Sequence, residues 1–191
     1  MVFRKTTYSQ SFFARPTLKV APELLGAFLN RRLPSGLILS AQISEVEAYT
    51  ADDPACHAYK GETNRCRVLF GPPGRAYVYF IYGMYHCLNI VTEPDGVAGA
   101  ILIRGLREEG LDGPGKICRE WQIDKQFNEL DLLNSNSSLW LSPPKGSLAG
   151  EIQISPRIGI SQAKERMWRF FLPTVKEKRS RSQLSNRRKK V

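Results

Sequence analysis

Two glutamates and a tyrosine occupy alternating positions in one short segment: Glu45, Glu47 and Tyr49. Because side chains alternate across a β-strand, the three share one face when the segment is extended. Carboxylates two strand positions apart are separated by roughly 6.6 Å. That spacing suits a pair flanking a water molecule, as in inverting glycoside hydrolysis. The competing interpretation, which this segment taken alone favours, is a strand with an ordinary polar face toward solvent.

Four tyrosines crowd nine positions further along: Tyr77, Tyr79, Tyr82 and Tyr85. Aromatic rings at this density can sandwich a nucleobase or wedge into a base stack. The alternative for this group is a hydrophobic core, to which strand aromatics more often belong. Tyr82 is the exception, because its neighbour Gly83 places it at a turn, where an exposed ring suits a wedge better than a core.

Three isolated polar residues complete the candidate chemistry. His57 falls in a loop, where it either contacts a ligand or simply faces solvent. Asn89 and Arg104 fall in strand-like runs, so each needs a polar partner if it is buried. Arg104 follows three apolar residues, which predicts a buried charge beside a carboxylate. Glu47 is the candidate partner.

A glycine-rich stretch, Gly113-Pro114-Gly115-Lys116, could offer backbone N–H groups and an ammonium group to a phosphate. It is too short for a P-loop, which argues against the use of a nucleoside triphosphate.

The four cysteines, at positions 56, 66, 87 and 118, contain no C-x-x-C pair, and His57 and His86 are the only histidines. A zinc site would therefore need an unusual ligand set. We expect reduced, partly buried thiols and no metal.

A mixed set of elements must hold these residues in place. Runs rich in β-branched and aromatic residues predict strands at 37–49, 75–81, 86–91 and 98–106, the middle two forming a hairpin. Helical spacing predicts a short helix within 11–29 whose apolar face includes Phe28, and a second helix at 117–127. A short strand is expected between loops at 135–138 and 142–146, and segment 162–171 is ambiguous. The long loop 50–73 is of a kind that is often functional.

We therefore expect a single mixed α/β domain of the α+β type, with a curved, mostly antiparallel β core flanked by helices, at residues 1–174. A basic, disordered tail follows at 175–191, and the sixteen residues from 176 carry +7 of the formal net charge of +10. Such a tail raises affinity for any polyanion, or serves solubility or targeting. No apolar run approaches the roughly 20 residues that cross a bilayer, and none near the start forms a signal peptide. We expect a soluble chain that does not use a membrane.

In their order along the chain, these motifs resemble the 3-methyladenine (alkyladenine, methylpurine) DNA glycosylase family. The resemblance runs from about residue 12 to residue 172. Its matching stretches are Phe12-Phe13-Ala14-Arg15-Pro16, Arg32-Leu33-Pro34-Ser35-Gly36, Glu45-Val46-Glu47-Ala48-Tyr49, Ala55-Cys56-His57, Asn64-Arg65, Tyr77 to Tyr85, Leu88-Asn89-Ile90, Leu102-Ile103-Arg104, Gly113-Pro114-Gly115-Lys116 and Pro156-Arg157-Ile158-Gly159-Ile160. One departure is the connection of eight residues between Arg104 and Gly113, where the family usually has a longer, partly helical segment.

The resemblance implies a role for each matching position. Glu47 would activate the attacking water, and Arg104 would help to hold that water and keep Glu47 ionised. The other implied residues of the base pocket are Tyr49, Ala55, His57, Tyr79, Asn89, which would crowd the 2-amino group of normal guanine, and Ile158, whose backbone would contact the water. The implied DNA contacts are Tyr82, which would fill the gap in the base stack, and Arg65, Met84, Tyr85 and Lys116.

The implied activity is base-excision repair on double-stranded DNA containing damaged purines, alkylated or deaminated. Damaged purines pair poorly and flip at lower cost, and an aromatic pocket attracts a cationic alkylpurine. Such an enzyme would leave an abasic site and need no cofactor. The sequence gives no sign of an oligomer or of an obligate protein partner, so we expect a monomer. It would act in the cytoplasm or nucleoid of a bacterium, or in the nucleus of a eukaryote. The alternatives are a non-catalytic damaged-DNA or RNA binding protein, a carbohydrate hydrolase using Glu45 and Glu47, and a lyase using Lys116 as an imine-forming amine.

Overall fold

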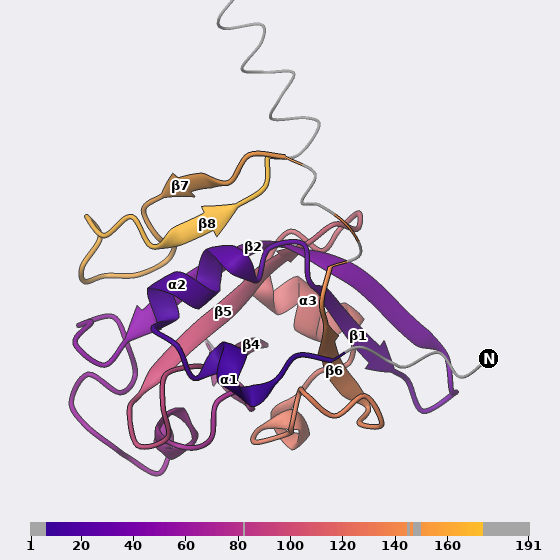
Figure 1. Cartoon of the computed structure of the whole chain (residues 1–191), viewed down its shortest axis with the longest axis horizontal. Coiled ribbons are helices and arrows are strands. Elements are labelled where there is room, and N and C mark those ends of the chain that lie inside the picture. Colours follow the sequence, from indigo (N-terminus) through magenta and orange to yellow (C-terminus); the bar gives the residue numbers. More distant parts are fainter. Residues whose placement is uncertain (1–6, 82, 145, 147–149, 174–191) are drawn as a thin grey trace, which may run out of the picture.

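The computed structural model describes residues 7–81, 83–144, 146 and 150–173, which form one curved sheet with helices packed against it (Figure 1). The strands are β1 (Phe28–Arg32), β2 (Ile38–Thr50), β3 (Ala76–Ile81), β4 (Tyr85–Val91), β5 (Gly99–Leu106), β6 (Leu139–Ser142), β7 (Gln153–Ser155) and β8 (Arg169–Phe171). The helices are α1 (Gln10–Phe13), α2 (Thr17–Glu23) and α3 (Pro114–Glu120), with short 3₁₀ turns η1 (Arg67–Phe70) and η2 (Lys125–Phe127). The predicted single α+β domain is confirmed.

Strand β2 lies in the interior of the sheet and pairs with three other strands, β1, β5 and β8. The strand order is β3-β4-β5-β2-β1-β6, and β8 pairs with both β2 and β7. All of these pairings are antiparallel. The first part of β2 pairs with β1 and the second part with β5 and β8, and the register with β5 shifts between Ile43 and Val46. Such a bulge bends a strand and re-aims its side chains, here immediately before Glu47.

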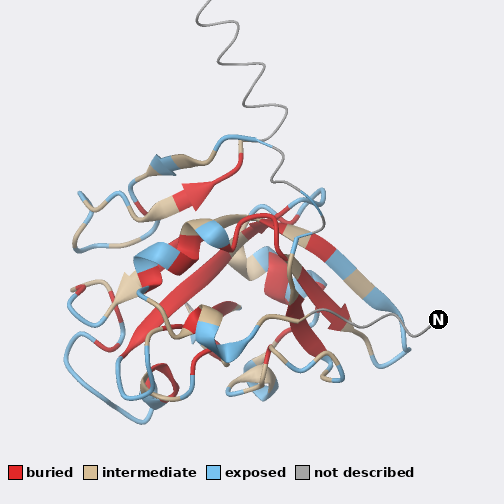
Figure 2. Ribbon diagram, viewed as in Figure 1, coloured by how far each residue is buried: buried red, intermediate tan, exposed pale blue. Residues whose placement is uncertain are grey.

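The main core lies where α2 and α3 pack on the sheet, and Figure 2 shows β5 and the second part of β2 as largely buried. Val46 and Ala48 are fully buried in this core, as expected for the face of β2 opposite the glutamates. Glu47 is fully buried as well, because β2 has strands on both sides and the 156–168 segment over its other face. An ordinary solvent-exposed polar face at this position is therefore ruled out.

A smaller apolar cluster lies under the 50–73 loop. Cys66 and Leu69 from the loop pack with Tyr77, Val91 and Ala100 from the sheet. The loop also contains η1 and several hydrogen-bonded turns, such as Cys56 N to Asp53 O at 2.8 Å. The loop therefore packs against the sheet instead of extending into solvent.

Three predictions about elements need correction. Phe28 begins β1 rather than extending a helix, since the chain turns at Gly26, where φ is 85°. Helix α3 begins at Pro114, three residues before the predicted start, because proline at the first helical position is already preorganised. It ends at Glu120, and residues 125–127 form the separate turn η2, capped by Asp124. The ambiguous segment 162–171 ends in β8.

Among the described residues, no helix is long and apolar enough to cross a membrane, and no group of His, Cys, Asp or Glu is arranged to hold a metal ion. The four cysteines are free and buried. Segment 175–191 lies outside the described residues.

Candidate active site

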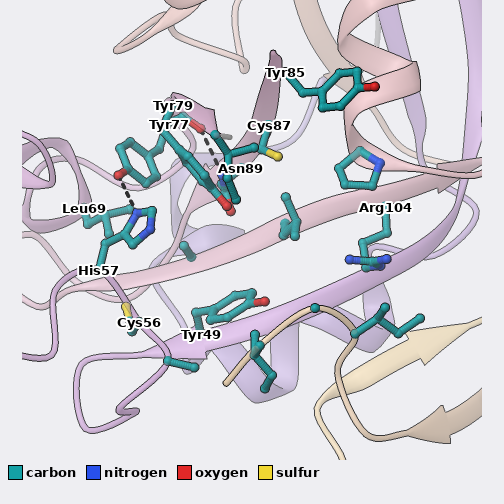
Figure 3. A pocket seen from close by; sticks show the side chains of 18 of the residues that line it. Tyr49, Cys56, His57, Leu69, Tyr77, Tyr79, Tyr85, Cys87, Asn89 and Arg104 are labelled. Atoms are coloured by element: carbon teal, nitrogen blue, oxygen red, sulfur yellow. Dashed lines mark hydrogen bonds between the residues drawn. The ribbon is translucent and has the colours of Figure 1, made fainter. Parts of the chain in front are cut away.

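A cavity of about 470 Å³ opens between the face of strands β3 to β5, the 50–73 loop and residues 158–161 (Figure 3). Its volume falls within the range of small-molecule binding sites. The predicted site residues that line it are Tyr49, Ala55, His57, Tyr79, Tyr85, Asn89, Arg104 and Ile158. Segments from nearly the whole domain thus meet at one place.

Aromatic rings form one wall of the cavity. The Tyr77 hydroxyl is hydrogen-bonded to His57 Nδ1 at 2.8 Å, and the ring centroids of His57 and Tyr79 are 4.6 Å apart. Burial lowers the pKa of His57, and the charge of Arg65 lowers it further. A neutral imidazole offers one donor and one acceptor, so this wall combines stacking surface with hydrogen-bonding capacity. Tyr77 belongs both to this wall and to the cluster under the loop.

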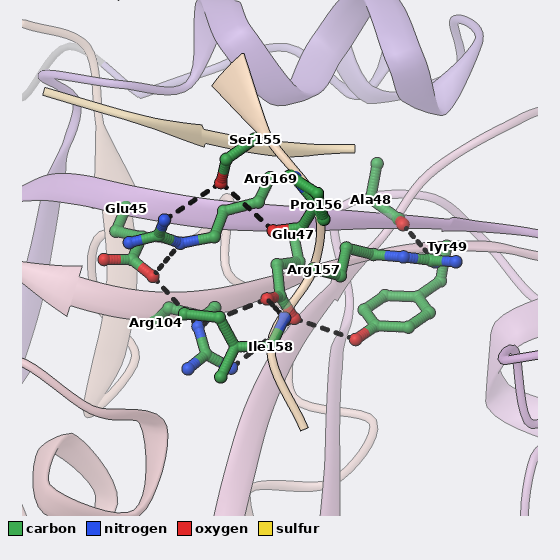
Figure 4. A network of polar contacts seen from close by, with 10 residues as sticks. All are labelled: Glu45, Glu47, Ala48, Tyr49, Arg104, Ser155, Pro156, Arg157, Ile158 and Arg169. Carbon is green, nitrogen blue, oxygen red and sulfur yellow. Dashed lines mark hydrogen bonds and ion pairs between the residues drawn. The ribbon is translucent and has the colours of Figure 1, made fainter. Parts of the chain in front are cut away.

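Glu47 is fully buried and lies next to Tyr49, Arg104 and Ile158, which line the cavity (Figure 4). Its Oε1 accepts a hydrogen bond from the backbone N–H of Ile158 at 2.7 Å, and its Oε2 accepts one from the Tyr49 hydroxyl at 2.8 Å. Burial raises the pKa of Tyr49 far above its usual value, and the Glu47 carboxylate raises it further, so Tyr49 remains a hydrogen-bond donor. Among the described residues, the hydrogen-bond and ion-pair partners of the Glu47 carboxylate are Tyr49, Ile158 and Arg104, and all three line the cavity.

Arg104 contributes the positive charge beside Glu47, as the sequence predicted. Arg104 Nε lies 3.4 Å from Glu47 Oε1 and Nη1 lies 3.5 Å from Oε2. The guanidinium group is held more tightly by Glu45, whose Oε1 accepts a hydrogen bond from Arg104 Nε at 3.0 Å. Arg104 therefore links the two glutamates.

Glu45 does not act as a second free carboxylate. Its Oε1 also accepts a hydrogen bond from Arg169 Nε at 2.7 Å. Burial by itself raises the pKa of Glu45, but the hydrogen bonds and charges of Arg169 and Arg104 outweigh it and lower the pKa below its usual value. The arrangement of two carboxylates flanking a water is absent at this site, because Glu45 is bound to two arginines.

Asn89 lies deep in the cavity and is almost fully buried. Its Nδ2 donates a hydrogen bond to the carbonyl oxygen of Tyr77 at 3.1 Å, which fixes the side chain against β3. Ala55 and Ile158 close the cavity from the two loops.

Of the predicted DNA contacts that the structure describes, Tyr85 lines the cavity, whereas Arg65, Met84 and Lys116 are exposed and outside its lining. Arg65 is exposed, with its guanidinium carbon 5.7 Å from the centroid of the Tyr79 ring. Met84 is strongly exposed and lines a second, smaller depression beside α3. Tyr82 lies outside the described residues.

The Gly113–Lys116 motif forms the N-terminal turn of α3, which begins at Pro114. A Cβ at Gly115 would lie 3.0 Å from the ring of Tyr85, so glycine allows that ring to pack on the start of α3. Lys116 is exposed, forms an ion pair with Asp112 at 2.7 Å, and is not part of the cavity lining.

The sequence analysis missed three charged residues behind the site: Asp53, Arg157 and Arg169. Arg157 belongs to a motif that matches the family, next to Ile158, but nothing in the sequence indicated that Asp53 is its partner. Asp53 and Arg169 carried no signal, because their partners lie 104 and 124 residues away in the chain.

A buried carboxylate behind an aromatic cavity of base-sized proportions fits the family that the motifs resemble. Residues 11–176 match the family model described as Methylpurine-DNA glycosylase. The chain belongs to this family. It is thus a DNA glycosylase of DNA repair for alkylated bases, and DNA is its substrate.

Relatives cover nearly the same span of the chain. A protein from Wolbachia pipientis subsp. Culex pipiens (strain wPip) is 49% identical over 171 residues, which are 86% of this chain and 89% of the relative. One from Sodalis glossinidius is 44% identical over 171 residues, 86% of this chain and 96% of the relative. One from Trichodesmium erythraeum is 40% identical over 185 residues, 85% of this chain and 92% of the relative. Each is named "Putative 3-methyladenine DNA glycosylase".

Proposed function

We propose that this glycosylase takes up a flipped purine, alkylated or deaminated, in the aromatic cavity and hydrolyses its N-glycosidic bond with a water activated by Glu47. The product is an abasic site with an intact DNA backbone. The observation that carries the proposal is the placement of Glu47: its carboxylate is completely buried, yet its partners Tyr49, Arg104 and Ile158 all line the cavity.

Burying a carboxylate is costly unless charge and hydrogen bonds compensate it. Arg104 and the two short hydrogen bonds from Tyr49 and Ile158 supply that compensation. A carboxylate accepts hydrogen bonds only and can take a proton from water. A positioned general base of this kind contributes about 10²- to 10⁴-fold to the rate.

The water would lie on the cavity side of Glu47 and Arg104, within hydrogen-bonding reach of both groups. The two side chains are themselves in contact, at 3.4 and 3.5 Å, so a water bonded to both lies beside this contact and not between its atoms. A water in this position faces the cavity, since Arg104 is part of the lining. Its oxygen bonds to the sugar carbon, its proton passes to Glu47, and the purine departs with the electrons of the N-glycosidic bond.

Substrate selection would come from the cavity wall. Tyr49, Tyr77 and Tyr79 attract a cationic alkylpurine through their ring faces. A cationic purine leaves as a neutral base, so cleavage of its N-glycosidic bond needs less catalytic assistance. For neutral deaminated or etheno-modified purines, the neutral His57 and the backbone of the 50–73 loop offer hydrogen bonds instead.

The decisive experiment uses a labelled duplex that contains one hypoxanthine or one ethenoadenine, and alkylated DNA for release of methylpurines. Alkali-labile abasic sites are scored after incubation with wild type and with Glu47→Gln. We expect cleavage by wild type and loss of cleavage by Glu47→Gln, with duplex binding retained. Glu23→Gln, the same change at an exposed residue of α2, serves as control and should match wild type.

Each other outcome has a definite meaning. Wild-type cleavage by Glu47→Gln would overturn the assignment of the water-activating base. Duplex binding by wild type without cleavage of any lesion would leave the alternative of a damaged-DNA binding protein. A covalent adduct trapped by borohydride would indicate a lyase, for which Lys116 stands outside the cavity lining.

A further inference from the structure

A completely buried ion pair joins two loops behind the cavity. Arg157 donates from Nη2 to Asp53 Oδ1 at 2.9 Å and from Nη1 to Asp53 Oδ2, so the pair is bidentate. Neither side chain has any exposed surface. A buried ion pair seldom stabilises a fold more than apolar packing does, so the position of this pair calls for a more specific explanation.

The neighbours of Arg157 are the groups that hold Glu47. The next residue, Ile158, donates its backbone N–H to Glu47 Oε1 at 2.7 Å. The Arg157 guanidinium carbon lies 4.6 Å from the centroid of the Tyr49 ring, whose hydroxyl donates to Glu47 Oε2. Nη1 of Arg157 also donates to the carbonyl oxygen of Ala48 at 2.9 Å, between Glu47 and Tyr49 in the chain (Figure 4).

The Arg157 guanidinium is fixed on several sides. Trp168 lies 5.1 Å from it by ring centroid, and the backbone carbonyl of Trp168 accepts a hydrogen bond from Ala48 N at 2.9 Å. Arg166 lies 4.4 Å from the same Trp168 ring and 3.8 Å from Asp53. Because a planar guanidinium held by a bidentate partner and by rings has little freedom, it can set the position of whatever it contacts.

We propose that Arg157 and Asp53 are positioning residues of the glycosylase reaction, which place the Ile158 N–H and the Tyr49 hydroxyl on the Glu47 carboxylate. Arg157 is not part of the cavity lining, so it acts through Ile158 and Tyr49 rather than on the base or the water. This inference rests on the proposed role of Glu47.

Arg157→Lys is the informative variant. Lysine keeps the positive charge beside Asp53 but presents a point charge instead of a planar fork, so it loses the bidentate pair and the flat contact with Tyr49. Misplacement of a catalytic group by about 1 Å can slow a reaction on the order of 100-fold. We expect single-turnover cleavage by Arg157→Lys to be about 10- to 100-fold slower than wild type, with duplex affinity unchanged.

Arg31→Lys is the matched control. Arg31 is also a buried arginine, hydrogen-bonded to the backbone carbonyls of Trp121 and Gln122, but it lies outside the cluster around Glu47, so this variant should cleave at the wild-type rate. Thermal unfolding of both variants verifies that they are folded. Asp53→Asn combined with Arg157→Gln replaces the ion pair by a neutral pair, and the same loss of rate is expected for it if Arg157→Lys does not fold.

The outcomes separate this inference from the proposed function. If Glu47→Gln cleaves like wild type, the proposed role of Glu47 fails. If Glu47→Gln is inactive and a folded Arg157→Lys cleaves like wild type, only the positioning role is overturned. Equal losses in Arg157→Lys and Arg31→Lys, or parallel losses of rate and duplex affinity, would also overturn it, because the buried arginine would then merely support the fold.

Discussion

Replacing Glu45 by glutamine tests the charge network behind the active site. Glu45 Oε1 accepts hydrogen bonds from Arg104 Nε at 3.0 Å and from Arg169 Nε at 2.7 Å. Glutamine has nearly the same shape and still offers an amide oxygen to both donors. The substitution therefore removes the charge while leaving both hydrogen bonds geometrically possible.

The magnitude follows from the attraction between opposite charges that the substitution removes. Hydrogen bonds to charged groups contribute about 1.5–3 kcal/mol; the bonds to glutamine still come from charged arginines, so each moves from the upper toward the lower end of that range and loses about 1–1.5 kcal/mol. The Glu45 side chain is 22% exposed, and solvent screening moves the total toward the lower end, about 2 kcal/mol. In a domain of this size that corresponds to a fall in Tm of about 4–8 °C.

The difference in unfolding free energy between wild type and Glu45→Gln should decrease as the pH falls. The two arginines lower the pKa of Glu45 in the folded protein, whereas the unfolded chain has the ordinary value of about 4.3. A lowered carboxyl pKa stabilises the fold fully above the unfolded value, and that stabilisation disappears as the pH falls through the folded value. The stability gap between wild type and Glu45→Gln should therefore be constant near neutrality and narrow below about pH 5.

The assay is urea unfolding of both proteins from neutral to acidic pH. Glu23→Gln is the matched control, because Glu23 is also paired with an arginine at 2.7 Å but is 50% exposed. Exposed pairs contribute about 0–1 kcal/mol, so this variant should stay close to wild type. Equal effects of the two substitutions, or a gap for Glu45→Gln that does not narrow in acid, would refute the reasoning.

Two further outcomes are expected. Asn89→Ala opens space in the cavity, so its release of normal guanine from undamaged duplex, measured by chromatography of free bases, should exceed that of wild type; unchanged release with lesion cleavage intact would contradict this. Burial raises the pKa of Cys56 to about 11 and also raises the pKa of Cys87, which lines the cavity. Thiolates are the reactive species, so intact-mass measurement should find no iodoacetamide adduct on native protein at about pH 7.5 and four after unfolding. Rapid labelling of native Cys87 would show that the cavity thiol ionises.

Much of the candidate site was predictable because its features are local. The period of two along 45–49 placed Glu47 and Tyr49 on one face, and the structure joins them by a hydrogen bond of 2.8 Å. The apolar run before Arg104 predicted a buried charge beside a carboxylate, which the structure also contains. The hairpin was likewise predicted from its strand-forming residues and its glycine turn.

The less successful predictions concern choices between two locally acceptable states. Phe28 fits the apolar face of a helix and equally the buried face of a strand, and pairing of β1 with β2 and β6 decides for the strand. Residues 114–116 fit a glycine-rich loop before a helix and equally the first turn of the helix, and the structure includes them in α3, where Gly115 packs against Tyr85. Local preference is weak compared with such tertiary contacts.

By itself the sequence predicted strands β2 to β6, the aromatic hairpin, the pairing of Glu47 with Arg104, and the resemblance to the glycosylase family. Only the tertiary structure decided that Glu45 is bound to Arg104 and Arg169 rather than free, and that Arg157 reaches Asp53 behind Tyr49. The physical reason is that side-chain alternation follows from backbone geometry within a few residues. An ion pair between segments more than a hundred residues apart exists only when packing of the whole sheet brings them together.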